Sequence, residues 1–330
     1  MNVRLWLLIL VTALPCAGAE EQAVRAAILK SLPLLERSSA ITIEERSNCF
    51  TCHHTGLPVL TLSTARERGF GVDARNLEAQ IQFTAAFLAK GRANYASGKG
   101  QGGQAYTAGS ALWTLELGGH KPDATTEAVM EFLLDYSKDA NHWKSPSDRP
   151  PSVESPFSTT FVVLKGLKTF GTPAQQERMA QRTARARDWL LKTPAKSTED
   201  KVFKLWSLAV TDADRAATQQ AAQDLLHLQR EDGGWAQLDG MSSDAYATGT
   251  ALVALHRTGF LAENDAGYDR GVNWLIQAQL DDGSWHVVSR SKPFQSYFES
   301  GYPHGKDQLI SMTAACWATI ALLEALSVVK

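Results

Sequence analysis

The feature that most constrains this chain is a seven-residue corner, Gln-x-x-x-Gly-x-Trp, that occurs at residues 229–235 and again at 279–285. Each copy follows an amphipathic stretch. Its Asp-Gly pair ends a helix, because glycine readily takes the left-handed conformation found after a helix C-terminus. The tryptophan can then pack back over the helix end, with its indole N–H donating to an exposed helix carbonyl. The pattern predicts helices joined by sharp corners, with Trp143, Trp235 and Trp285 as structural plugs.

A second element also repeats. Residues 105–112 (Ala-Tyr-Thr-Ala-Gly-Ser-Ala-Leu) match residues 245–252 (Ala-Tyr-Ala-Thr-Gly-Thr-Ala-Leu) almost position for position. Helices rich in small residues are predicted to begin near residues 105, 158, 199, 244 and 310, a spacing of roughly 40 to 65 residues that is typical of two-helix repeats. Because a helix pair cannot bury its apolar face alone, the pairs must stack. We expect a closed double layer with the small-residue helices inside, in preference to an open solenoid.

The predicted pairs follow one another along the chain. They are 76–91 with 105–118, 125–138 with 158–170, 174–192 with 198–210, 214–229 with 243–258, and 267–279 with 307–328. Before them, residues 20–37 form an amphipathic pattern that predicts a helix, and residues 38–47 are predicted to be a polar link. Strand-like alternation is lacking, which disfavours a β-propeller.

The N-terminus has the pattern of a signal peptide. Arg4 precedes an apolar run over residues 5–14, and Ala17-Gly-Ala19 is a small-residue cleavage site. We expect residues 1–19 to be removed after Ala19 and the protein to be periplasmic or secreted. The apolar run is shorter than the roughly 20 residues that span a bilayer, and no membrane span is expected in the mature chain. With a net charge of −2 and no basic run, nucleic-acid binding is not expected either.

The corners and small-residue helices resemble the terpenoid-cyclase and protein-prenyltransferase superfamily, most closely the C-terminal half of squalene-hopene cyclases. The resemblance covers about residues 76–330. It implies an all-α fold, an (α/α) toroid of about five to six helix hairpins around a central cavity. It also implies an apolar or polyprenoid ligand in the cavity. Residues 20–75, outside the resemblance, are expected to form a short N-terminal helical extension.

The chemistry of these relatives is not visible in the sequence. The Asp-x-Asp-Asp motif with which squalene-hopene cyclases protonate an alkene is absent, and the nearest run, Asp212-Ala-Asp214-Arg215, is better interpreted as a helix cap. The prenyltransferase zinc site needs Asp, Cys and His near inner-helix starts. Asp244 has no nearby cysteine and Cys316 lies a turn inside a later helix, so no zinc is expected.

The segment Cys49-Phe-Thr-Cys52-His53 has the spacing of a c-type haem attachment site. The two thiols would add to the haem vinyl groups, and His53 would be an axial ligand of the iron. Export suits this chemistry, and the three cysteines left after signal removal argue against a disulfide framework. A Cys49–Cys52 disulfide or free thiols, or a soft-metal site that includes His54, remain alternatives. Candidate distal ligands are His304, Met241 and Met312.

A second group of polar residues lies near the predicted starts of inner helices. Asp244, Tyr246, His304 and Asp307 are candidates for acid/base chemistry near the cavity mouth, although Asp307 could equally cap its helix. Three functions are therefore open. The first is an exported c-type haem protein with a redox partner, the second a divergent cyclase-like isomerase or lyase without haem, and the third a non-catalytic binding toroid.

Overall fold

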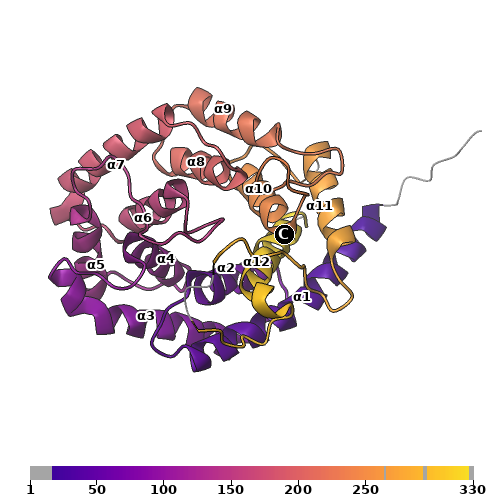
Figure 1. Cartoon of the computed structure of the whole chain (residues 1–330), viewed down its shortest axis with the longest axis horizontal. Coiled ribbons are helices and arrows are strands. Elements are labelled where there is room, and N and C mark those ends of the chain that lie inside the picture. The colour runs from indigo at the N-terminus through magenta and orange to yellow at the C-terminus, as the bar shows by residue number, and fades with distance from the viewer. Residues whose placement is uncertain (1–16, 264, 293–295, 327–330) are drawn as a thin grey trace, which may run out of the picture.

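The computed structural model describes residues 17–263, 265–292 and 296–326, and its helices form two concentric rings (Figure 1). The outer ring consists of α1 (Ala17–Glu45), α3 (Ala74–Ala96), α5 (Ala124–Asp135), α7 (Gln176–Lys192), α9 (Arg215–Leu226) and α11 (Ala266–Ala278). The inner ring consists of α2 (Leu57–Glu67), α4 (Gln104–Leu117), α6 (Pro156–Phe170), α8 (Thr198–Val210), α10 (Ala245–Arg257) and α12 (Gln308–Glu324). Three short helical turns are η1 (Cys52–Gly56), η2 (Pro173–Gln175) and η3 (Gly305–Asp307). The described residues contain no strand, and the predicted all-α toroid is confirmed.

The tryptophan corners have the predicted geometry. The indole N–H of Trp235 donates to the carbonyl oxygen of Leu225 at 2.9 Å, and that of Trp285 to Leu275 at 2.8 Å. Trp143, which has no Gln-x-x-x-Gly before it, makes the same bond to Leu133 at 2.9 Å. All three indoles are fully buried and reach back ten residues to a helix end. Burying an indole is favourable here because its one donor is satisfied.

The glutamines of the two corners tie neighbouring pairs together. Gln229 Nε2 donates to the carbonyl of Gly233 in its own corner and to that of Gly267 in α11, at 2.9 and 2.7 Å. Gln279 repeats this with Gly283 at 3.0 Å and with Ala27 in α1 at 2.9 Å. Helix α1 thus takes the place of the next outer helix after α11. The segment 20–75 completes the ring as its sixth pair, with α1 outside and α2 inside (Figure 1).

The small residues of the inner helices allow close packing, as predicted. A Cβ atom on Gly109 of α4 would lie 2.8 Å from the backbone carbon of Val162 in α6. One on Gly249 of α10 would lie 2.7 Å from the backbone nitrogen of Ala318 in α12. Contacts this short leave no room for any side chain, so the inner helices approach each other backbone to backbone.

The predicted polar link over residues 38–47 is wrong, because α1 continues to Glu45. Ser38, Ser39 and Thr42 are buried. The Thr42 hydroxyl donates to the Ser38 carbonyl at 2.8 Å, and the Ser38 hydroxyl donates to the sulfur of Met312 at 3.0 Å. Hydroxyl groups satisfied in this way can be buried, so a polar pattern here does not mark an exposed link.

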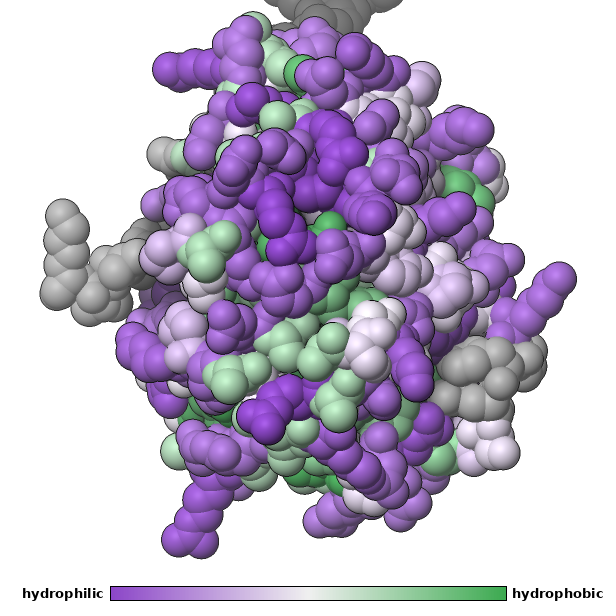
Figure 2. All heavy atoms as spheres, turned by 90° about the vertical axis from the view of Figure 1, so that its left-hand side faces the viewer, coloured by the Kyte–Doolittle hydropathy of each residue, from purple (hydrophilic) through white to green (hydrophobic). Residues whose placement is uncertain are grey.

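The side of the outer ring that carries α5 and α7 is predominantly hydrophilic. Figure 2 shows the side of the molecule that carries α5 and α7, and polar and charged side chains cover most of it. Helix α7 buries only Arg182, Ala186 and Leu190. Among the described helices, none combines the length and apolar character needed to cross a membrane.

Candidate functional site

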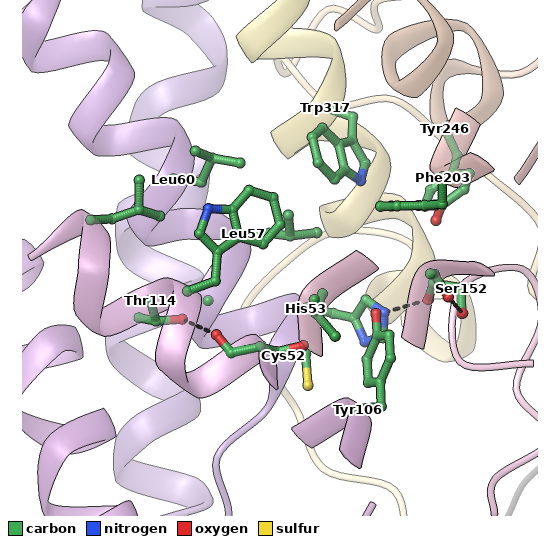
Figure 3. Close-up of a pocket in the computed structure, with 16 residues that line it drawn as sticks. Cys52, His53, Leu57, Leu60, Tyr106, Thr114, Ser152, Phe203, Tyr246 and Trp317 are labelled. Carbon is green, nitrogen blue, oxygen red and sulfur yellow. Dashed lines mark hydrogen bonds between the residues drawn. The ribbon is translucent and has the colours of Figure 1, made fainter. Parts of the chain in front are cut away.

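The centre of the ring is filled by aromatic side chains of the inner helices. Trp206 of α8 packs against Phe161 and Trp317 with ring centroids 5.0 and 5.6 Å apart, and against Trp113 at 6.4 Å. The remaining void has a volume of about 30 Å³, and Trp317, Phe203, Leu57 and Leu60 crowd around it (Figure 3). This is on the order of the volume that one water molecule occupies.

A second and much larger cavity, of about 870 Å³, opens at one mouth of the ring. We call it the mouth cavity. The segment after α1, the loops before α4 and α6, and the start of α12 form its wall. Apolar side chains on it include Phe50, Phe87, Phe298, Leu309 and Ile310. Its size falls within the range of small-molecule and cofactor sites.

The predicted haem-attachment residues all lie on the wall of the mouth cavity. Cys49, Cys52 and His53 line it together, because the chain turns there from α1 through the single π-helical turn η1 into α2. π-helical turns recur at functional sites. Both thiols are free, so the disulfide alternative is not formed in this structure. Burial raises the pKa of the Cys52 thiol to about 11, which keeps it neutral.

Two adjacent imidazoles in η1 are held in their neutral form. Burial, with a smaller contribution from Arg149, lowers the pKa of His53 to about 4. Burial lowers the pKa of His54 to about 3. His53 Nε2 is hydrogen-bonded to Ser152 Oγ at 2.5 Å, and its ring stacks on Tyr106 with centroids 6.2 Å apart (Figure 3). His54 is 2% exposed and its Nε2 has no hydrogen-bond partner. Neutral imidazoles are the form that binds metals.

The arrangement of the described residues supports neither the soft-metal alternative nor the three candidate distal ligands. Within residues 17–263, 265–292 and 296–326, no three His, Cys, Asp or Glu side chains gather as a metal site, so the soft-metal alternative gains no support. The candidate distal ligands His304, Met241 and Met312 are absent from the wall of the mouth cavity. Met312 instead contacts Ser38, and His304 is hydrogen-bonded to Ser284 Oγ at 2.9 Å.

Sequence reasoning missed a buried polar network next to η1. The Ser152 side chain, bonded to His53, also lies beside the phenol groups of Tyr106 and Tyr246 and interacts with both. Tyr246 OH donates to Glu199 Oε2 at 2.9 Å, and Glu199 Oε1 has no partner. Burial raises the pKa of Glu199 to about 8, so this carboxyl group is mostly protonated at neutral pH. No pattern in the sequence reveals this network, because an acid in the first turn of a helix normally stabilises the helix dipole from the solvent side.

The four residues predicted for acid/base chemistry do not form one cluster. Tyr246 belongs to the Glu199 network, whereas Asp244 caps α10 by accepting from Ala247 N at 3.0 Å. Asp307 accepts a hydrogen bond from Ser289 N and pairs with His286, both at 3.0 Å. His286 stacks on His304 with centroids 4.5 Å apart. Of the four, Tyr246 alone lines either cavity, and their catalytic role stays a prediction.

This architecture, a double ring of helix pairs joined by tryptophan corners, defines the class of the protein as a terpene-cyclase-like α/α toroid. Residues 187–329 match the squalene-hopene cyclase C-terminal domain family. The chain is 36% identical over 95 residues to lanosterol synthase of Saccharomyces cerevisiae, which is 29% of this chain and 12% of that protein. It is 31% identical over 101 residues to squalene–hopene cyclase of Zymomonas mobilis, which is 26% of this chain and 15% of that enzyme. The matches thus span only a small part of these relatives.

Solved structures support the same class over the whole ring. A variant of the type II terpene cyclase MstE from Scytonema, in complex with geranylgeranyl dihydroxybenzoate, superposes with a TM-score of 0.63 at 13% identity. The alignment covers 94% of this chain and 100% of that chain. A protein from Actinoplanes gives a TM-score of 0.58 at 15% identity, over 93% and 100% of the two chains. Together the comparisons support the terpenoid cyclase superfamily, and at these identities the solved structures show the fold alone.

Proposed function

We propose that this protein is an exported c-type haem protein whose haem occupies the mouth cavity and serves a redox or haem-dependent role. The observation that carries the proposal is that Cys49, Cys52 and His53 line one cavity of about 870 Å³. The spacing of the three residues is that of covalent haem attachment, and the cavity offers aromatic and aliphatic walls for a porphyrin. The alternative space, at the centre of the ring, measures about 30 Å³.

The donor chemistry of the wall fits the group. The two free thiols would carry the thioether links, and the neutral imidazole of His53 would bind the iron. Coordination through Nε2 requires the Ser152 hydroxyl, now 2.5 Å away, to turn aside. A haem held here supplies one-electron redox chemistry, which implies an electron-exchanging redox partner. The chain's own residues would attach the group through Cys49 and Cys52, hold His53 neutral by burial, and offer an apolar wall in Phe50 and Phe87, which pack together with centroids 5.8 Å apart.

Export is part of the same proposal, because covalent haem attachment by this motif takes place outside the cytoplasm. The expected signal peptide lies mostly outside the described residues. Mass analysis of the mature protein from a periplasmic or culture fraction should find Glu20 as the first residue. A mature protein that retains the first 19 residues would contradict the predicted cleavage.

The alternative of a cyclase-like isomerase or lyase acting on a polyprenoid has weaker support. Asp244, His304 and Asp307 line neither the central void nor the mouth cavity. An apolar ligand remains compatible with the mouth cavity, whose walls include Phe298 and Ile310.

The test is a pyridine haemochrome spectrum of the protein exported from a host with c-type haem maturation machinery. We expect a c-type band that survives denaturation in the wild type and is lost in Cys49→Ala/Cys52→Ala. Cys316→Ala is the matched control, because Cys316 is buried in α12 and is absent from the cavity wall. Soluble wild-type protein without the band would refute the haem proposal, as would a band that persists in the double variant.

A further inference from the structure

The charged side chains on the wall of the mouth cavity are all basic. Arg46, Arg149 and Lys306 line it, and no Asp or Glu does so among the described residues. The guanidinium of Arg46 lies over the ring of Phe298, 5.1 Å from its centroid, so a cation sits directly on an apolar wall. The chain as a whole has a net charge of −2, so this cationic lining is a local feature.

Helix ends add to the positive potential. Three helical segments begin on the cavity wall: η1, which continues into α2, then α4, and α12. The residues before them, Thr51, Gly103 and Asp307, make no capping hydrogen bond with their side chains. The other inner helices, α6, α8 and α10, are each capped by a Ser or Asp side chain. The helix N-termini that face the cavity are therefore those without a side-chain cap, and such ends favour anions.

One buried side chain on the cavity wall lacks a hydrogen-bond partner. His54 also lines the cavity, is 2% exposed, and has an Nε2 atom with no partner. A polar atom buried without a partner calls for an explanation, and a molecule held in the cavity would supply one.

We propose that the mouth cavity is a binding site for an amphipathic carboxylate, held at its acidic end by Arg149 and Lys306 and at its apolar body by Phe50, Phe87 and Phe298. Cations and uncapped helix ends would stabilise the carboxylate, and the aromatic wall would bury the hydrocarbon. This chemistry has two sources. Haem carries two carboxylates of its own, and a free carboxylated lipid carries one. The inference does not require that haem be attached.

The experiment uses the full-length Cys49→Ala/Cys52→Ala protein, which cannot carry covalent haem. The probe is dansylaminoundecanoic acid, and its methyl ester is the uncharged match. We expect the acid to bind at least about tenfold more tightly than the ester, with an affinity that falls as salt rises. Adding Arg149→Gln and Lys306→Gln should abolish the preference for the acid and leave ester binding unchanged. Arg149→Lys in place of Arg149→Gln should restore part of the preference. Lys192→Gln, which removes an exposed cation at the end of α7 outside the cavity wall, should have no effect.

The outcomes separate the two proposals. Equal affinity for acid and ester, or a preference that survives the loss of both cations, overturns the carboxylate site. If haem is attached to the wild type, the probe should be excluded from the haem-loaded form and bind the double cysteine variant. If the wild type carries no haem yet prefers the acid, the haem proposal fails and the carboxylate site stands, with a free lipid as its source.

Discussion

Replacing Glu199 with glutamine should remove a specific pH dependence from the stability of this protein. Glu199 is 3% exposed, and burial raises its pKa from 4.5 to about 8. Between these values the unfolded chain has lost the proton while the folded protein retains it. The unfolded state thus binds fewer protons, and the free energy of unfolding falls as pH rises from about 4.5 through 8. The wild type should be more stable at pH 5 than at pH 8 for this reason.

The magnitude follows from the same two values. They span about 3.5 pH units, and each is worth about 1.4 kcal/mol, so the ceiling is about 5 kcal/mol. Most of this, about 3 to 4 kcal/mol, should be lost between pH 5 and pH 8. Glutamine has nearly the same shape, its side-chain oxygen can still accept the hydrogen bond from Tyr246 OH, and it does not titrate. The free energy of unfolding of Glu199→Gln should therefore rise steadily relative to that of the wild type as the pH rises.

Urea unfolding of both proteins at half-unit steps from pH 5 to 8 measures the effect. Groups such as Asp244, whose pKa burial raises to about 6, titrate in both proteins and cancel in the difference. Glu231→Gln, at an exposed position, is the control and should follow the wild type at every pH. Parallel curves for the wild type and Glu199→Gln would show that Glu199 is ionised in the folded protein, and would refute the account of a buried neutral acid.

Three further changes test the construction of the ring by urea unfolding. Gly249→Ala should lower the free energy of unfolding by about 1–3 kcal/mol, because the new Cβ would lie 2.7 Å from the backbone of α12. Gly71→Ala is the control and should leave the free energy of unfolding unchanged, because a Cβ there meets nothing within 4 Å. Gln279→Ala should cost about 1–3 kcal/mol by removing the amide that joins α11 to α1, and an unchanged midpoint would show that this link is not needed. Trp235→Phe should cost a similar amount, since it leaves the Leu225 carbonyl without its indole donor; a stability equal to that of the wild type would contradict this role.

The ring itself could be predicted because its determinants are local. Each Gln-x-x-x-Gly-x-Trp corner carries its own helix stop, donor and acceptor within about ten residues, as Trp285 and Leu275 show. The small-residue helices can be recognised in the sequence by their content of Ala, Gly, Ser and Thr. The end of α1 could not be predicted in this way, because Ser38 and Thr42 are polar yet buried, and their partners include Met312 far along the chain.

The site was only partly predictable for the same reason. The spacing of Cys49, Cys52 and His53 is local and visible in the sequence. The cavity that they line is not, since Arg149 and Lys306 reach it from loops that are far apart in the chain. The burial of Glu199, which depends on Tyr246 of another repeat, was equally invisible.

The packing of the inner ring explains why the larger space lies at its mouth. Backbone contacts such as those at Gly109 and Gly249 draw the inner helices together, and the aromatic side chains of their middle turns then meet at the axis. A ligand the size of a porphyrin or a long hydrocarbon cannot enter a void of about 30 Å³. At the mouth, the segment from Cys49 to His53, basic side chains and helix ends without a side-chain cap line a cavity of about 870 Å³. A scaffold that resembles the terpene cyclases in its framework thus has its larger cavity at one mouth of the ring, and Cys52 and His53 line both this cavity and the small central void.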